Sequence, residues 1–272
     1  MGEYTKLTIN QPGREQSDIL IALLSEMGFD GFSENPGSME AYVATGLFDQ
    51  NETGGLLLRM GLTYSIETIK ETNWNEEWER NFMPVQVEDF CMVRAPFHPA
   101  EPGIAFDLVI QPKMSFGTGH HATTQLMIGA MKSLPVKDAV VLDLGTGTGL
   151  LAILAEKMGA GNVLAIDNDQ WSLQNARENM EMNNCGRIVL QFGEGMPAGR
   201  SFGIILANIN RNVLLNQLPS MSQQLQKGGV LVISGLLEGD LPVIRQKANV
   251  TELIEKEVFT KEGWVAIEYL KR

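Results

Sequence analysis

The sequence predicts an α/β protein in which a small α+β domain precedes a larger domain built on βαβ units. The main observation is the apolar run Val140–Leu144, which leads into glycines at positions 145, 147 and 149 and then into a buried helix pattern over Leu150–Met158. A strand, a glycine-rich turn and a helix in this order begin a βαβ unit. The first 70 residues have a different order of elements, βαββαβ.

The front of the chain, residues 1–71, is predicted as the small α+β domain. A helix that Ser17 caps carries its leucines on one stripe. A second helix, over residues 49–60, is weaker because two glycines interrupt it. The strand patterns are at residues 6–10, 31–34, 39–44 and 64–69. The resulting order of elements is typical of a ferredoxin-like domain.

Residues 72–83 are predicted as a helical linker between the two domains. Trp74 and Trp78 are i,i+4 neighbours on one face of a short helix, which Pro84 ends. The two rings either pack into a seam between the domains, which we favour, or form a surface that contacts a substrate.

The larger domain is predicted to span residues 84–272. Its helix patterns follow the loop Met114–Thr124 and recur at residues 150–158, 170–182, 213–226 and 238–248. Its strand patterns are at residues 85–94, 104–111, 140–144, 162–166, 187–192, 202–208, 230–234, 252–259 and 264–270. Lys261-Glu262-Gly263 is a hairpin signal between the last two strands.

The glycine-rich turn indicates a nucleoside-binding site. Its glycines are spaced G-x-G-x-G, whereas a dinucleotide fingerprint is G-x-G-x-x-G. Asp167 ends the next strand and follows Gly145 by 22 residues, close to the roughly 20 expected for a carboxylate that binds ribose hydroxyls. A glycine-rich turn also occurs without a ligand, but Asp143 before the turn and Asp167 after it favour the cofactor interpretation.

Two further stretches carry candidate site residues. The loop Met114–Thr124 contains glycines and leads into a helix, so it is a candidate lid over the ligand, with Thr123 and Thr124 near the helix start. Asn208 ends an apolar strand and therefore lies at the carboxyl edge of the sheet, where open α/β proteins bind ligands. We favour a catalytic-site role for Asn208 over that of a turn residue.

The composition is that of a globular protein, with 44% hydrophobic and 20% charged residues. No apolar run reaches the length of about 18 residues that spans a membrane, and the N-terminus lacks the features of a secretory signal. Cys91 and Cys185 are far apart, which argues against a disulfide framework and favours the cytoplasm. The three histidines are too few and too badly spaced for a metal site, so no metal is expected.

The net charge of −12 is concentrated at the front of the chain. Residues 1–90 hold 16 acidic and 5 basic side chains, a net charge of −11, whereas the rest of the chain has a net charge of −1. This distribution argues against direct binding of nucleic acid, which needs a basic face. It suits a basic protein partner, although charge of this kind also aids solubility.

Taken together, several stretches resemble one family, the bacterial methyltransferases that modify large-subunit ribosomal protein eleven. The glycine-rich turn and the acid after the next strand are general to class I S-adenosylmethionine-dependent methyltransferases, whereas the loop before the turn is much more specific. The matching stretches are Trp74, Trp78, Phe82 and Pro84; Phe116-Gly-Thr-Gly-His-His-Ala-Thr-Thr124; Leu142-Asp-Leu-Gly-Thr-Gly-Thr-Gly149; Ala165-Ile-Asp167; Ala207-Asn-Ile209; Lys227-Gly-Gly229 with Ser234-Gly235; and Glu262-Gly-Trp264.

The resemblance implies a class I methyltransferase domain, with a doubly wound seven-stranded sheet whose last strand is antiparallel. It also implies a ferredoxin-like substrate-recognition domain, S-adenosylmethionine as the cofactor, and a cytoplasmic enzyme that we expect to be a monomer. The implied reaction methylates lysine side chains and the α-amine of a basic ribosomal protein, up to the trimethylated state. The cofactor-binding residues carried over are Phe116, Gly117, Thr118, Thr124, Gly145, Gly147, Asp167 and Asn208, and Asn208 is also the candidate catalytic residue.

Other functions fit the sequence less well. An amino-methyltransferase that acts on nucleic acid often carries Asn-Pro-Pro-Tyr where this chain has Asn208-Ile-Asn-Arg211, which lacks an aromatic ring to stack on a flipped base. A small-molecule methyltransferase would not need the front domain. A nucleoside-binding module without catalysis is a further alternative, and the glycine spacing disfavours a dinucleotide-dependent reductase.

Overall fold

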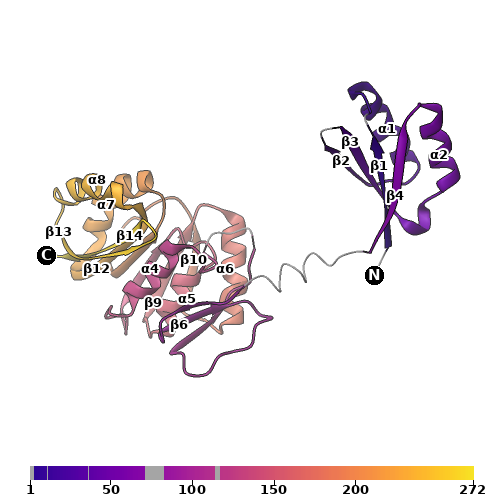
Figure 1. Ribbon diagram of the computed structural model, residues 1–272. Helices are drawn as coiled ribbons and strands as arrows, with labels where there is room; N and C mark the ends of the chain where they lie inside the picture. Colours follow the sequence, from indigo (N-terminus) through magenta and orange to yellow (C-terminus); the bar gives the residue numbers. More distant parts are fainter. Residues whose placement is uncertain (1–2, 11, 36, 71–82, 114–116) are drawn as a thin grey trace. The chain divides into compact units, whose positions relative to one another are not determined.

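The computed structural model describes residues 3–10, 12–35, 37–70, 83–113 and 117–272 (Figure 1). The chain divides into two compact units, Met1–Asn81 and Phe82–Arg272. The predicted helical linker, residues 72–83 with Trp74 and Trp78, lies outside the described residues except for Met83.

The described part of the first unit is a four-stranded antiparallel sheet with two helices. In chain order the elements are β1 (Glu3–Asn10), α1 (Arg14–Glu26), β2 (Gly31–Asn35), β3 (Ser38–Ala44), the 3-10 turn η1 (Thr45–Leu47), α2 (Gln50–Arg59) and β4 (Thr63–Lys70). The strands lie in the order β2-β3-β1-β4. This is the βαββαβ order from which the sequence predicts a ferredoxin-like domain.

Helix α2 forms despite its two glycines because its first turn is capped. The Asp49 carboxylate accepts hydrogen bonds from the backbone N–H groups of Asn51 and Glu52, at 2.8 and 3.0 Å, which satisfies donors that have no partner inside the helix. Burial of Leu57 against the sheet then holds the helix in place. The fully buried residues Leu7, Ile9, Leu20, Leu24, Met39, Ala41, Val43 and Leu57 form most of this core.

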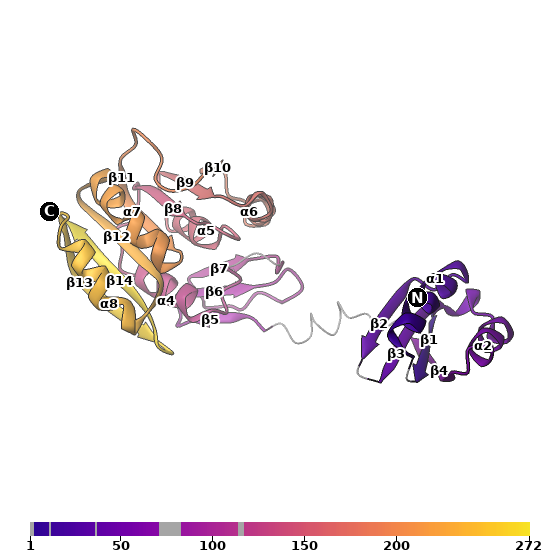
Figure 2. The same cartoon turned by 90° about the horizontal axis from the view of Figure 1, so that it is seen from above.

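The second unit contains a seven-stranded sheet in the order β10-β9-β8-β11-β12-β14-β13 (Figures 1 and 2). The first five strands are parallel, and β14 pairs antiparallel with both of its neighbours. This confirms the predicted doubly wound sheet with an antiparallel last strand. Its strands are β8 (Val140–Leu144), β9 (Asn162–Asp167), β10 (Ile188–Phe192), β11 (Phe202–Asn208), β12 (Leu225–Leu237), β13 (Leu253–Lys261) and β14 (Trp264–Lys271).

Alternate residues of the central strands face two separate apolar cores, as expected for a sheet covered on both sides. Val141 of β8 belongs to one core, together with residues of α4 (Ala122–Met131) and α5 (Leu150–Lys157). Leu142 belongs to the other core, together with residues of α7 (Arg211–Gln224) and α8 (Leu241–Ala248). Helix α6 (Gln170–Met182) lies beside α5. None of the helices in the described part of the chain is long and apolar enough to cross a lipid bilayer.

A small sheet precedes the large one and departs in one respect from the sequence prediction. The single strand predicted at residues 85–94 is two strands, β5 (Val85–Val87) and β6 (Cys91–Arg94), which pair antiparallel around a turn. Glu88 in this turn has a φ of 50°, a conformation that is rare outside turns. The third strand, β7 (Phe106–Val109), pairs parallel with β6 and packs on α5.

The helix predicted at residues 238–248 begins later than expected. Residues Glu238–Asp240 form a 3-10 turn, and α8 starts at Leu241 with Pro242 in its first turn. Proline is tolerated there because the first N–H groups of a helix have no partner inside it.

Candidate functional site

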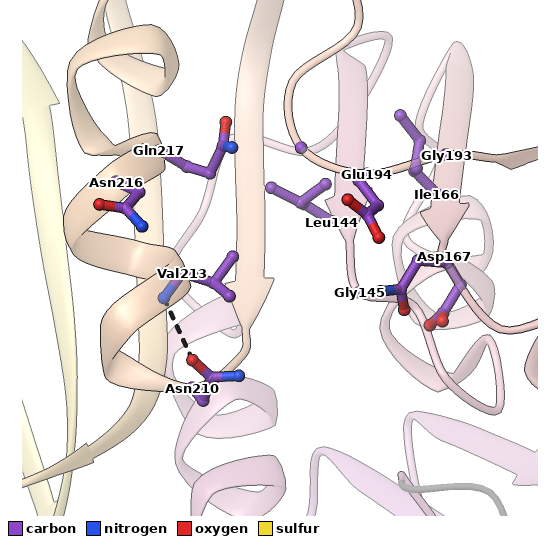
Figure 3. A pocket seen from close by; sticks show the side chains of 12 residues that line it. Leu144, Gly145, Ile166, Asp167, Gly193, Glu194, Asn210, Val213, Asn216 and Gln217 are labelled. Carbon is purple, nitrogen blue, oxygen red and sulfur yellow. Dashed lines mark hydrogen bonds between the residues drawn. The ribbon is translucent and has the colours of Figure 1, made fainter.

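A cavity of about 320 Å³ opens at the carboxyl end of the large sheet. It lies where the strand order reverses between β8 and β11, the place where doubly wound sheets bind ligands. Figure 3 shows Asp167 and Glu194 at the strand ends on one side of the cavity, with residues of α7 on the other. Its lining comprises Leu144, Gly145, Ile166, Asp167, Asn168, Gly193, Glu194, Gly195, Asn210, Val213, Asn216 and Gln217.

The charge of this lining selects among ligands. Asp167 and Glu194 are its two charged residues, and both are acidic. Two carboxylates disfavour an anionic group placed beside them and favour a group that is neutral, positively charged or able to donate hydrogen bonds, such as a ribose hydroxyl.

Asp167 is held in place by the backbone around it. One carboxylate oxygen accepts from the N–H of Gly147 at 2.8 Å, and the other accepts from the N–H of Asp169 at 3.0 Å. Each carboxylate oxygen can accept more than one hydrogen bond, so Asp167 keeps acceptor capacity towards the cavity. The structure therefore brings three of the predicted residues, Gly145, Gly147 and Asp167, to one end of β8 and β9.

Asp143 supports the glycine-rich turn from inside the protein. Its side chain is fully buried, and one carboxylate oxygen accepts from the Thr146 hydroxyl at 2.6 Å and from the N–H of Ala152 at 3.1 Å. The other oxygen has no hydrogen-bond partner among the described residues. Burial raises the pKa of Asp143 to about 7, and the charge of Asp167 adds to this rise while the two hydrogen bonds oppose it.

Ile209, which directly follows β11, lies in close contact with two glycines, one after β8 and one near the end of β12. A Cβ atom at Gly145, after β8, would overlap the side chain of Ile209, and one at Gly235, in β12, would overlap the Ile209 carbonyl oxygen. Both glycines have positive φ angles, 74° and 90°, which a residue with a side chain adopts only with strain. The two glycines thereby fix where the chain leaves β11 and where Asn208 lies.

Asn208 and Thr124 contact each other and are not among the residues that line the cavity described above. The Asn208 amide Nδ2 donates to the Thr124 hydroxyl at 3.4 Å, which joins the end of β11 to the first turn of α4. The Asn208 Oδ1 atom is buried and has no partner among the described residues. An orphaned acceptor of this kind is costly unless a ligand donates to it.

The loop before α4 is joined to the glycine-rich turn. The Thr148 hydroxyl donates to the carbonyl oxygen of Gly117 at 2.6 Å, and the Thr118 hydroxyl lies 3.2 Å from Nδ1 of His120. Phe116, also predicted to bind the cofactor, lies outside the described residues, as do Met114 and Ser115 of the candidate lid.

His121 has a structural role at the start of α4. Its Nδ1 atom lies 2.7 Å from the Thr123 hydroxyl and accepts from the Thr123 N–H at 3.3 Å, which caps the helix. Its ring also meets Trp264 edge to face, with ring centroids 4.7 Å apart. Among the described residues, no group of three or more His, Cys, Asp or Glu side chains is arranged to hold a metal ion.

Sequence reasoning missed the contribution of α7 to the cavity. Asn210 caps this helix by accepting from the N–H of Val213 at 3.1 Å, and Gln217 accepts from the N–H of Met196 at 3.2 Å. Both residues line the cavity. The cap signal of Asn210 is visible in the sequence, but the position of Gln217 depends on how α7 packs against the sheet.

Comparison with protein families gives one match that covers most of the chain. A model described as "Ribosomal protein L11 methyltransferase (PrmA)" matches residues 38–272. The ribosomal protein L11 methyltransferase of Porphyromonas gingivalis is 39% identical over 260 residues, which cover 93% of this chain and 90% of the relative. That of Chlorobaculum tepidum is 33% identical over 263 residues, with coverage of 92% and 90%.

Solved structures show the same fold. A ribosomal protein L11 methylase from Lactobacillus delbrueckii subsp. bulgaricus has a TM-score of 0.65 and 28% identity, and the match covers 70% of this chain and 100% of that one. A methyltransferase from Pyrococcus furiosus has a TM-score of 0.50 and 22% identity, with coverage of 60% and 89%. This second likeness supports the fold alone.

The burial of Asp143 predicts a specific dependence of stability on pH. Because its pKa is raised to about 7 in the folded protein and is about 3.9 in an unfolded chain, the folded state binds the proton more tightly. The free energy of unfolding should therefore fall as the pH rises from about 4 to about 7, by up to about 4 kcal/mol, and then level off. Denaturant unfolding of the wild type and of Asp143→Asn across this range measures the effect. A difference between the two proteins that does not change with pH would contradict it.

The close contact between Gly235 and Ile209 predicts that one added methyl group lowers the stability of the fold strongly. Gly235→Ala should lower the free energy of unfolding by about 2–4 kcal/mol, because the new Cβ meets backbone and the φ angle is unfavourable. Gly239→Ala is the matched control, since a Cβ there would meet nothing within 4 Å. Thermal unfolding of both variants makes the comparison, and equal melting temperatures would show that the strand ends tolerate displacement.

Proposed function

Because this chain belongs to the ribosomal protein L11 methyltransferase family, we propose that it transfers methyl groups from S-adenosylmethionine to amines of large-subunit ribosomal protein L11. The enzyme is a methyltransferase of the class I fold, and S-adenosylmethionine is its cofactor. We propose lysine side chains and the N-terminal α-amine as the methylated groups, up to the trimethylated state. The observation that carries the proposal is the family match over residues 38–272.

The described residues fit this cofactor. Gly145 lines the cavity with backbone alone, Asp167 has acceptor capacity for ribose hydroxyls, and the lining of the cavity is free of basic residues. We propose that these two residues and Gly147 hold the nucleoside, and that Gly117, Thr118 and Thr124 bind it from the α4 side, with Phe116. When bound, S-adenosylmethionine supplies an electrophilic methyl group on a positively charged sulfur.

Asn208 is the residue we propose to hold the acceptor amine. Its Nδ2 atom already donates to Thr124, and its buried Oδ1 atom is the acceptor left over. An amine N–H that donates to Oδ1 would satisfy this atom and keep the nitrogen lone pair free to point elsewhere. Asn208 would thus act by positioning the amine. Its neutral amide would not take up the proton of the amine.

A lysine must lose a proton before it can attack, because its pKa in water is about 10.4. Desolvation lowers the pKa of an amine, so a water-poor site favours the reactive form. The described residues that we assign to the amine include no dedicated base. We therefore propose that the chain accelerates the reaction chiefly through positioning.

The acidic first unit is the part we propose to bind the protein substrate. It holds most of the net charge of −12, and complementary potentials steer a basic partner to an acidic surface. Residues 1–71 would then be the substrate-recognition domain, residues 72–83 the linker and residues 84–272 the catalytic domain. We further propose that the enzyme works in the cytoplasm as a monomer, without direct contact to nucleic acid.

Incubation of the pure protein with S-adenosylmethionine and ribosomal protein L11 tests this function. Mass spectrometry should show that L11 gains mass in steps of one methyl group. Asp167→Ala should weaken S-adenosylmethionine binding by about 1.5–3 kcal/mol, the scale of a hydrogen bond to a charged group, as measured by calorimetry.

Asp169→Ala is the control for this variant. Asp169 accepts from the N–H groups of Trp171 and Ser172 and thereby caps α6, so its loss should lower stability by about 1 kcal/mol without changing cofactor affinity. Equal affinities of the wild type and Asp167→Ala would contradict the proposed ribose contact, and an unmodified L11 would contradict the function.

A fragment that begins at Met83 separates substrate docking from cofactor binding. It contains the glycine-rich turn, Asp167 and Asn208, so it should bind S-adenosylmethionine like the full chain and lose activity on intact L11. For the full chain, raising the salt concentration from about 50 to about 500 mM should raise the KM for L11 through screening. Cofactor affinity should stay nearly constant. A fragment that methylates L11 as fast as the full chain would refute the docking role.

A further inference from the structure

Helix α6 buries three asparagines on one face, behind the glycine-rich turn. Asn175, Asn179 and Asn183 follow one another at intervals of four residues, so they lie on the same side of the helix and its end. Their exposed fractions are 1%, 0% and 4%. A buried amide is costly unless it is hydrogen-bonded. Asn175 accepts from Nδ2 of Asn179 at 3.4 Å through its Oδ1 atom, while its own Nδ2 atom has no partner among the described residues. The partners of Asn179 and Asn183 show which parts of the structure these two side chains hold.

Asn183 binds the outer edge of β7 as a neighbouring strand would. Its Oδ1 atom accepts from the N–H of Val109 at 3.0 Å, and its Nδ2 atom donates to the carbonyl oxygen of the same residue at 2.7 Å. Among the described strands, β7 pairs with β6, so this amide satisfies backbone groups on its other edge. Its Nδ2 atom also donates to the carbonyl oxygen of Asn179 at 2.7 Å, so, among the described residues, Asn183 ties β7 to the last turn of α6 and makes no bond to the glycine-rich turn.

Asn179 differs because it joins two segments. Its Oδ1 atom accepts from the N–H of Gln111 at 2.8 Å, just beyond β7, and its Nδ2 atom donates to the carbonyl oxygen of Thr148 at 2.7 Å. The Thr148 hydroxyl in turn donates to the carbonyl oxygen of Gly117 at 2.6 Å. The chain on both sides of residues 112–116 is thus tied to one point of the glycine-rich turn.

We propose that Asn179 is a positioning residue for the cofactor site. It sets the glycine-rich turn and Gly117 in one fixed arrangement by holding the Thr148 peptide, and it acts through Thr148 without touching a ligand itself. Fixing both sides of a site before binding lowers the entropic cost of binding. The assignment of Gly117 and the turn to S-adenosylmethionine rests on the function proposed above, whereas the link between them rests on the hydrogen bonds.

The test compares Asn179→Ala with Asn183→Ala in the full-length protein. Both variants remove a fully buried amide from the same face, so both should lower the melting temperature by a similar amount. Asn179→Ala should weaken S-adenosylmethionine binding about tenfold in calorimetry, the size of one lost hydrogen bond. Asn183→Ala should leave the affinity within about twofold of wild type, since it makes no bond to the turn.

Hydrogen exchange in the cofactor-free protein gives a second readout. The amides of residues 117–119 should exchange about tenfold faster in Asn179→Ala, and at the wild-type rate in Asn183→Ala. Equal effects of the two variants on exchange and affinity, or no effect of Asn179→Ala on either, would overturn the proposal. A wild-type protein that fails to bind S-adenosylmethionine would instead refute the proposed function. The exchange data would then still test whether Asn179 holds Gly117 through Thr148.

Thr148→Val tests the same link from the other end. Valine keeps the shape of threonine and removes only the hydroxyl that donates to Gly117, so this variant also serves if Asn179→Ala does not fold. It should reproduce the faster exchange at residues 117–119. The double variant should be about as impaired as the worse single variant, because both changes break one chain of bonds. If the double variant instead showed the product of the two single effects on exchange, Asn179 and Thr148 would act independently, and the proposed link between them would be overturned.

Discussion

The close approach of three strand ends is the constraint on which the candidate site depends. Ile209, at the exit of β11, lies where side chains at Gly145 and Gly235 would have to be. Because these glycines let β8, β11 and β12 converge, the cavity, the turn and Asn208 share one edge of the sheet. The sheet is covered by apolar layers on both faces, so a close-packed interior resists displacement of any one strand end.

Buried polar side chains hold the glycine-rich turn in addition to the strand contacts. Asp143 holds the inner side of the glycine-rich turn through Thr146 and Ala152, while Asn179 holds the carbonyl of Thr148 from α6. Apolar side chains would fill the same space, but they would leave backbone N–H and C=O groups of the turn and of β7 without partners. Polar residues at these buried positions are therefore explained by the hydrogen bonds they make, which hold the turn from two sides.

Much of the molecule could be predicted from local patterns. Short stretches of sequence predict the order of the elements, the division of the chain into two unlike parts, the glycine-rich turn and the position of Asp167 at a strand end. Hydrophobic periodicity and turn residues act over a few residues and leave a direct trace. The patterns failed where a short feature interrupts an apolar run, as at Glu88 between β5 and β6. They also misplaced two helix starts: α1 begins at Arg14 with Gly13 rather than Ser17 as its N-cap, and α8 begins at Leu241 after a 3-10 turn.

The sequence by itself determined most of the strands and helices, the glycine-rich turn and the acidic character of the first 90 residues, because each depends on neighbours in the chain or on composition alone. Only the tertiary structure decided that α7 supplies Gln217 to the cavity, that Asn208 meets Thr124, 84 residues away, and that Asn179 joins Gln111 to Thr148. These contacts depend on how the helices pack on the sheet. Local sequence patterns do not distinguish between the many residue pairs that could meet in this way.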